Sequence, residues 1–156
     1  MKSKLVALSL AAALVVPAFS EARPVTFATK LKPYSGEGAY LAIYLTDAKG
    51  QYKKTVWVAG KKPKFFKHLA DWARGSGLRA SEYDGVSGAS VLSGQALKVT
   101  VDLADSLIDA GYQLRIDSAV EDMRDNRAEV ITPFTTQGAG KPVAGKGYVQ
   151  SFTYTF

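Results

Sequence analysis

The 156-residue sequence contains no cysteine and only one histidine, His68. Without thiols the chain cannot form disulfides, attach c-type haem, or build iron–sulfur or thiolate zinc centres. A histidine-based metal site or a Ser-His-Asp hydrolase would depend on His68 alone, and no Gly-x-Ser-x-Gly sequence accompanies it. If an exported protein of this composition has a redox function, an attached organic cofactor is the main option left.

Long apolar runs are also scarce, and the clearest one lies at the N-terminus. Residues 5–16 are apolar, follow Lys2 and Lys4, and precede Pro17 and a small-residue site at 18–20. A membrane-spanning helix needs about 20 apolar residues, so this run is too short for a retained anchor. The pattern predicts a secretory signal peptide.

We expect the signal peptide to comprise residues 1–20, with cleavage after Ser20 or, alternatively, after Ala22. Losing Lys2 and Lys4 lowers the net charge from +6 to +4, which is too mild to indicate a nucleic-acid partner. No second apolar segment approaches membrane length, so no transmembrane segment is expected in the mature chain. Residues 21–156 have the size of one domain, and we expect a single periplasmic β-sandwich domain.

Short segments with period-two alternation and β-branched or aromatic residues predict most of the secondary structure. The turn sequence at 47–50, Asp-Ala-Lys-Gly, joins the clearest hairpin. Seven such segments and one helix indicate a mostly β fold, an antiparallel immunoglobulin-like β-sandwich with one short amphipathic helix. The expected strands cover residues 24–31, 39–46, 52–59, 96–103, 112–120, 129–134 and 148–156.

Residues 63–74 have apolar side chains at helical spacing, with Pro63 suited to the first turn and glycines beyond the end. Four lysines crowd the start of this predicted helix: Lys61, Lys62, Lys64 and Lys67. Cations at a helix N-terminus oppose its dipole. The cluster therefore fits an anionic partner, such as a flavin phosphate or an acidic protein surface, or else an ordinary solvated lysine face.

Three further patterns do not indicate a site. Residues 140–147 approach a phosphate-binding P-loop, but Gly147 stands where Ser or Thr must meet magnesium, and a strand follows where a helix is needed. The alternating aromatics of residues 148–156 also occur at the ends of outer-membrane barrels, and we interpret them as core. Asp102, Asp105 and Asp109 have no metal-loop spacing. No metal site and no catalytic residue is predicted.

Residues 84–90 read Asp-Gly-Val-Ser-Gly-Ala-Ser. Asp84, Ser87, Gly88, Ala89 and Ser90 match the pattern Asp-x-x-Ser/Thr-Gly-Ala-Ser/Thr. This resembles the acceptor sequence on which an FAD:protein FMN transferase joins FMN to the last hydroxyl through a phosphoester. The resemblance implies covalent FMN on Ser90. The best-known acceptors end in threonine, and serine offers the same hydroxyl.

The residue types of this motif suit such a reaction. A serine hydroxyl is a poor nucleophile, so an external enzyme must supply the base, and the peptide must fit inside that enzyme. Gly85, Gly88 and Ala89 permit close approach, and Asp84 is able to engage a metal or fix a turn. Ser-Gly-Ala-Ser is equally typical of a plain surface loop, which is the alternative interpretation.

Aromatic and cationic side chains near the motif are the candidate flavin contacts. Tyr83 directly precedes the motif, and Trp72 and Lys64 lie in or beside the predicted helix. Trp57 and Phe65 are further candidates, because planar aromatic rings stack well on one another. The default role of all these aromatic rings is packing.

Most of the mature chain resembles the predicted periplasmic family known as domain of unknown function 2271. The residues that carry this resemblance are the 39–59 hairpin, Leu69 and Trp72 in the lysine-rich helix, residues 84–90, and Gly111-Tyr112. The resemblance implies an extracytoplasmic electron carrier working with a PepSY-type membrane redox protein. Two alternatives stay open: a non-redox periplasmic binding or assembly module, and a small flavin-dependent periplasmic reductase.

Overall fold

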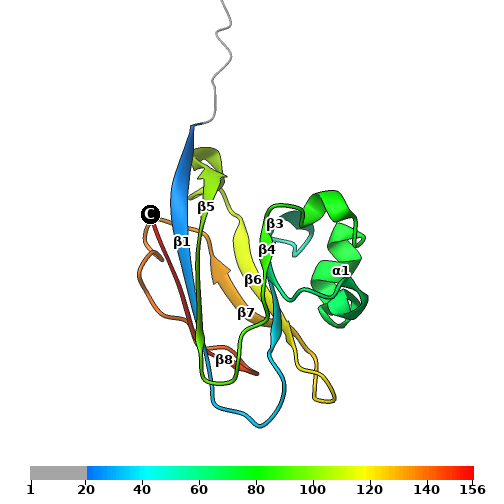
Figure 1. The fold of residues 1–156 in the computed structure, drawn as a ribbon. Helices are drawn as coiled ribbons and strands as arrows, with labels where there is room; N and C mark the ends of the chain where they lie inside the picture. The colour runs from blue at the N-terminus through cyan, green and yellow to red at the C-terminus, as the bar shows by residue number, and fades with distance from the viewer. Residues whose placement is uncertain (1–20) are drawn as a thin grey trace, which may run out of the picture.

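Two β-sheets pack face to face, and a helical layer covers the outer face of the larger one (Figure 1). The computed structural model describes residues 21–156, so the predicted signal peptide lies outside the described residues. The smaller sheet has the order β5-β1-β8 and the larger β4-β3-β2-β6-β7. All pairings are antiparallel except β3 with β4, which is parallel. The predicted β-sandwich is confirmed.

The strands are β1 (Ala22–Leu31), β2 (Tyr40–Thr46), β3 (Tyr52–Ala59), β4 (Ser87–Gly88), β5 (Ala96–Ala104), β6 (Gln113–Ala119), β7 (Asn126–Pro133) and β8 (Val149–Thr155). Seven of them match predicted strands within a few residues at each end. The largest difference is β7, which begins three residues before the predicted start at 129. A register shift between Ile116 and Ser118, and Ala128 at φ +42°, mark an irregularity there. The early part of β7 therefore lacks the alternation by which strands are predicted.

The main core fills the space between the two sheets. It takes alternate residues over long stretches of several strands, such as Leu41, Ile43 and Leu45 of β2, as period-two geometry requires. Phe27 of β1 stacks on Phe152 of β8 with ring centroids 6.2 Å apart. Three of the C-terminal aromatics interpreted as core are buried, Tyr148, Phe152 and Tyr154, whereas Phe156 is 41% exposed.

The helical layer consists of the 3-10 segment η1 (Pro63–His68), α1 (Ala70–Ser76) and the 3-10 turn η2 (Ala80–Glu82); a third 3-10 turn, η3 (Asp105–Leu107), follows β5. The helix predicted over 63–74 has the right location but is two segments. The chain breaks at Leu69, where φ is −86° and ψ is 70°. Leu69 is fully buried, so packing at this position outweighs continuation of a single helix. No described helix is long and apolar enough to cross a membrane.

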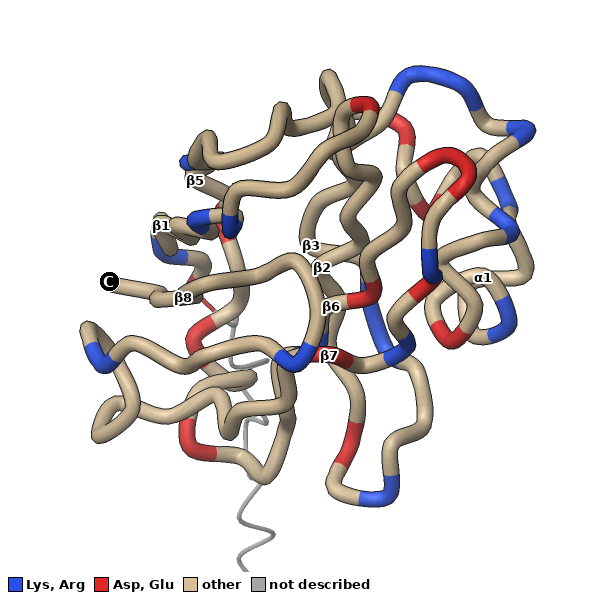
Figure 2. The backbone as a smooth tube through the Cα atoms, turned by 90° about the horizontal axis from the view of Figure 1, so that it is seen from below, with Lys and Arg blue, Asp and Glu red and all other residues tan. Residues whose placement is uncertain are grey.

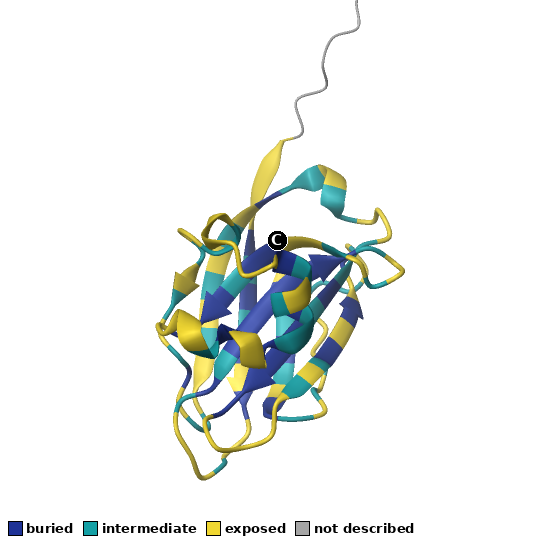
Figure 3. Cartoon of the chain, turned by 90° about the vertical axis from the view of Figure 1, so that its right-hand side faces the viewer, coloured by how far each residue is buried: buried dark blue, intermediate teal, exposed yellow. Residues whose placement is uncertain are grey.

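A second core lies between the helical layer and the five-stranded sheet, whose strands are largely buried behind the helices in Figure 3. Phe66 and Trp72 meet edge to face with centroids 5.5 Å apart. Their partners on the sheet include Ala42, Tyr44 and Val58, which face away from the main core. The amphipathic pattern predicted for this segment thus corresponds to a real buried face.

Asp117 joins this helical layer to the sheet. It is fully buried in β6, and its carboxylate accepts hydrogen bonds from the Tyr44 hydroxyl (2.9 Å), the Trp72 backbone N–H (2.8 Å) and the Ala128 backbone N–H (2.7 Å). Trp72 lies in the first turn of α1, so the carboxylate satisfies one of the free N–H groups at the helix start. Burial raises the pKa of Asp117, while its three donors favour the charged form.

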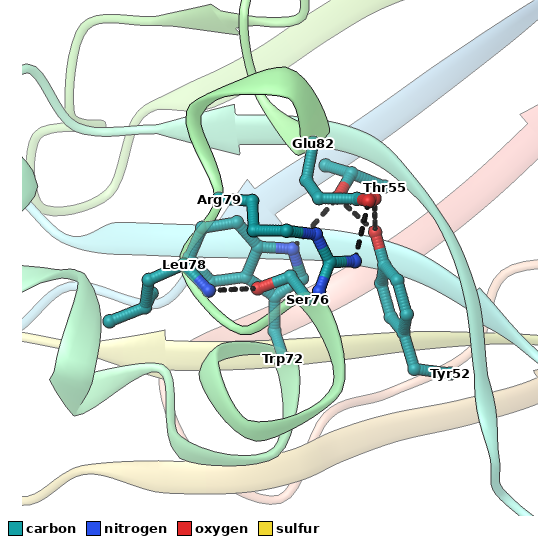
Figure 4. A network of polar contacts seen from close by, with 7 residues as sticks. All are labelled: Tyr52, Thr55, Trp72, Ser76, Leu78, Arg79 and Glu82. Atoms are coloured by element: carbon teal, nitrogen blue, oxygen red, sulfur yellow. Dashed lines mark hydrogen bonds and ion pairs between the residues drawn. The ribbon is translucent and has the colours of Figure 1, made fainter.

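A second polar network fastens the far end of the helical layer to β3 (Figure 4). The Trp72 indole donates to the Thr55 hydroxyl at 2.9 Å, and Thr55 and Tyr52 hydroxyls lie 2.7 Å apart. The Tyr52 hydroxyl donates to Glu82 at 2.5 Å, and Glu82 also accepts from Arg79 at 2.8 Å. Burial, followed by the bond to Glu82, raises the pKa of Tyr52 to about 12, so Tyr52 is a neutral donor at physiological pH.

We expect Asp117→Ala to lower the free energy of unfolding by about 3 kcal/mol or more, since two buried donors and one half-buried donor lose their acceptor and a buried donor left unpaired costs about 1–3 kcal/mol. Urea denaturation followed by tryptophan fluorescence measures this. Asp102→Ala is the matched control, because Asp102 is exposed on β5, and its effect should stay within about 0.5 kcal/mol. Equal stabilities for the two variants would show that Asp117 does not hold the layer.

Candidate functional site

Ser90 lies in a groove of about 690 Å³ formed by the end of the 84–90 motif, η1 and the turn that follows β6. Ala89 and Ser90 contribute one side of the groove, Tyr40 and Phe65 are aromatic lining residues, and Lys61 and Lys62 are also among its lining residues. These segments are far apart in the sequence. The fold therefore joins the predicted acceptor serine with part of the predicted lysine cluster.

The motif is held at the edge of the five-stranded sheet by backbone hydrogen bonds. Gly85 has φ +79°, a conformation that favours glycine, and turns the chain toward β3. The Val58 N–H then donates to the Val86 carbonyl at 2.9 Å, and the Gly60 N–H to the Gly88 carbonyl at 2.8 Å. The segment predicted as a loop is therefore partly a strand, because two of its residues pair with β3 as β4.

Beyond β4, the chain is fixed again directly after Ser90. Ala39 and Val91 exchange backbone hydrogen bonds of 2.7 and 3.0 Å, forming an isolated antiparallel bridge. Ser90 is thus held between two backbone attachments. Its side chain is half-buried rather than free in solvent.

Two close approaches explain why glycine suits this region. A Cβ on Gly38 would lie 2.6 Å from the Ser90 hydroxyl oxygen, and a Cβ on Gly88 would lie 3.0 Å from the Trp57 ring. Gly38 therefore leaves the space that the Ser90 side chain occupies, and Gly88 lets β4 lie against Trp57. Within residues 21–156, no side chain forms a hydrogen bond with the Ser90 hydroxyl.

The aromatic lining of the groove comes from two different elements. Tyr40, at the start of β2, and Phe65, in η1, meet at 90° with ring centroids 5.8 Å apart. The Tyr40 hydroxyl accepts the Lys62 backbone N–H at 3.2 Å, which ties the start of η1 to the strand. The Lys64 ammonium lies 4.9 Å from the Phe65 ring centroid, within the range of a cation–π contact.

The groove also has an acidic side. His68 Nδ1 lies 2.9 Å from an Asp125 carboxylate oxygen, and both residues line the groove with Glu121 and Asp122. In Figure 2 a lysine-rich run beside the helical layer approaches loops marked as acidic. Nevertheless, no three metal-ligating side chains converge closely enough in residues 21–156 to hold a metal ion.

The predicted flavin contacts are distributed unevenly around this groove. Lys64 is exposed and contacts the Phe65 ring, but it does not line the groove itself. Trp72 is fully buried and Tyr83 packs against it with centroids 6.2 Å apart, so both belong to the second core and neither lines the groove. Trp57 packs against the main core beneath Gly88. Of the predicted aromatic candidates, the structure brings Phe65 to Ser90.

The motif residues themselves are mostly accessible. Asp84, Gly85, Ser87 and Ala89 are exposed, and Gly88 is half-buried. Asp84 lies at the opposite end of the motif from Ser90 and is not part of the groove lining. An enzyme that approaches from solvent meets most of the segment directly.

Several groove residues carry no signal in the sequence. Tyr40 belongs to the alternation of β2, and its neighbour in the groove, Phe65, is 25 positions away. Gly38 and the His68–Asp125 pair are likewise joined to Ser90 only by the fold. The one cue to Tyr40 in the sequence is its alternation with Ala42 and Tyr44. It lies on the same face of β2 as these two residues, and that face meets the helical layer.

Comparison with curated proteins and with solved structures finds no match. A family model, described as a predicted periplasmic protein, matches residues 22–151. This span covers β1 to β7, the first residues of β8, the helical layer and the groove around Ser90. The chain therefore belongs to the DUF2271 family of predicted periplasmic proteins.

Proposed function

We propose that this periplasmic protein is a flavoprotein that carries FMN in a phosphoester on Ser90 and exchanges electrons with a membrane redox partner. One observation carries this proposal: the residue with the last hydroxyl of the flavinylation-like motif lines a groove that also has an aromatic lining and two lysines. If the motif were a plain surface loop, the serine, the aromatic rings and the lysines would lie together only by chance.

The size of the groove and part of its lining support this proposal. Cofactor pockets typically measure roughly 300–1,000 Å³ and combine apolar walls with a few polar groups, and this one measures about 690 Å³. Tyr40 and Phe65 would hold the ring, since aromatic side chains bind planar rings well. Lys61 and Lys62 form no ion pair with a described carboxylate and would balance the negative charge of the phosphate and the reduced ring.

Attachment requires a second protein. The Ser90 oxygen forms the new bond to the phosphorus of FMN, the pyrophosphate bond of FAD breaks, AMP leaves, and the hydroxyl proton passes to a base of an FAD:protein FMN transferase. Within the described chain no carboxylate or imidazole accepts a hydrogen bond from Ser90. An external base is consistent with that geometry.

Bound FMN supplies one-electron and two-electron transfer. The chain's own residues would hold the ring at the surface, between the two lysines that precede η1 and the acidic turn after β6, where a docked protein would reach it. The covalent tether prevents loss of the cofactor to the surrounding medium. A PepSY-type membrane redox protein is the partner that we propose.

We expect the exported protein, co-expressed with an FAD:protein FMN transferase, to gain the mass of one FMN minus one water. Ser90→Ala should remove this adduct completely, because no other hydroxyl occupies the acceptor position. Ser81→Ala is the matched control, since Ser81 is an exposed serine outside the motif. Intact-mass spectrometry of the three proteins checks this, and an adduct that survives in Ser90→Ala would exclude Ser90 as the attachment site.

In the modified protein, the Tyr40 ring, which lines the groove, should quench flavin fluorescence, because a tyrosine in contact with the excited ring donates an electron to it. Tyr40→Phe should raise the fluorescence yield by about twofold or more, because it keeps a planar ring in the groove but removes the electron donor. Phe156→Leu, at the end of the chain beyond β8, should leave it unchanged. Steady-state fluorescence at matched flavin absorbance measures the effect, and equal yields in all three proteins would place the ring outside the groove.

Lys61 and Lys62 should raise the midpoint potential of the flavin, because positive charge stabilises its reduced, more negative form. The double variant Lys61→Gln/Lys62→Gln should lower the potential by on the order of 10–30 mV, since 30 mV corresponds to about 1.4 kcal/mol for two electrons and exposed charges contribute less than this each. Lys98→Gln/Lys141→Gln is the charge-matched control, because Lys98 lies in β5 and Lys141 in the loop between β7 and β8, both outside the groove. Spectroelectrochemistry at low salt would contradict the assignment if both double variants shifted equally.

A further inference from the structure

A second groove lies at the opposite end of the helical layer and shares no lining residue with the groove at Ser90. Its volume is about 440 Å³, and it is formed by the turn between β2 and β3, the end of α1, and β6. Three cationic side chains, Lys49, Arg74 and Arg115, line it beside one carboxylate, Asp71. The groove therefore has an excess of positive charge.

Arg115 is the most constrained of these cations. It projects from β6 on the same face as Asp117, and one of its terminal nitrogens donates to the Gln113 side chain at 3.0 Å. Its Nε is buried and has no hydrogen-bond acceptor. No carboxylate of residues 21–156 forms a salt bridge with Arg115. A partly desolvated guanidinium without an anion is costly, and such a group calls for a partner.

The other charged residues of the groove do not supply an anion for Arg115. Arg74 and Lys49 are exposed and form no ion pair within the described chain. Asp71 is already engaged, because its carboxylate accepts two hydrogen bonds from Arg127, of 2.9 and 2.5 Å. The C-terminal carbonyls of α1 oppose an anion nearby, but this helix has only seven residues, and three full positive charges outweigh it.

The turn that bounds the groove is fixed in advance. The Asp47 carboxylate accepts the backbone N–H groups of Lys49 and Gln51, both at 2.9 Å. Gly50 has φ +80°, and a Cβ there would lie 3.0 Å from the Arg115 guanidinium. Glycine thus lets the turn close over the arginine, so that the groove needs no rearrangement to present its cations.

We propose that this groove binds a small oxyanion, a carboxylate or phosphate group, with the Arg115 guanidinium as its principal ligand and Arg74 and Lys49 as supporting charges. The planar fork of an arginine matches both kinds of oxyanion. Because the groove is separate from Ser90, this site works whether or not the protein carries a flavin.

The test is an NMR titration of the ¹⁵N-labelled exported protein with inorganic phosphate and, separately, with succinate, at constant ionic strength to suppress general screening. We expect saturable shifts of the Gly50 and Gly75 amides with a Kd of about 1 mM or tighter for at least one of the two anions. Saturation by phosphate alone assigns a phosphate site, and saturation by succinate alone assigns a carboxylate site.

Arg115→Gln should weaken binding by about tenfold or more, since it removes a charge-assisted pair of hydrogen bonds. Arg74→Gln, an exposed change that leaves Arg115 in place, should weaken it by about threefold. Arg124→Gln, an exposed arginine outside the groove, is the matched control and should have no effect. Shifts that rise linearly to about 50 mM anion, or an equal Kd in the wild type, Arg115→Gln and Arg74→Gln, would overturn the proposal.

Discussion

The buried carboxylate of Asp117 is the interaction on which the arrangement of this protein depends most. It links three elements that the chain visits far apart: Tyr44 in β2, Trp72 in α1 and Ala128 in β7. A carboxylate without these donors would be too costly to bury. Because α1 follows η1 directly, fixing Trp72 also fixes the segment that carries Phe65 and the lysines. Asp117 therefore helps to position the η1 wall of the groove at Ser90, although Asp117 itself does not line that groove.

The sandwich itself was predictable because its strands are amphipathic. Alternation in segments such as 96–103 assigns one face to the core whatever the partner strand is. The prediction was least accurate where packing or irregular backbone decides. Leu69 divides the helical segment in two because its side chain is fully buried, and the bulge near Ser118 conceals the start of β7. Neither the break at Leu69 nor the bulge near Ser118 has a residue pattern of its own by which it could be predicted.

Prediction of the site was more limited, for a similar reason. The acceptor serine follows from a local motif, and the lysines from a local cluster, so both can be named from the sequence. That the serine and the lysines lie in one groove cannot be predicted, because this requires β4 to pair with β3 and η1 to pack on β2. The same limit applies to Tyr40. Trp72 was a candidate flavin contact because it lies near the motif in the sequence, but it is fully buried in the second core. The basic groove at Arg115 likewise joins a turn, a helix end and a strand.

In this protein a rigid sandwich supports a helical layer that has an aromatic, lysine-rimmed groove at one end and a basic groove at the other. The proposed function depends above all on a covalent bond between Ser90 and FMN. The most direct measurement is tandem mass spectrometry of the tryptic peptide 80–98, from protein purified out of the periplasm of its own host. We expect one FMN, localised by fragment ions to Ser90 and not to Ser81, Ser87 or Ser93. An unmodified peptide from cells with an active transferase, or FMN on another serine, would contradict it.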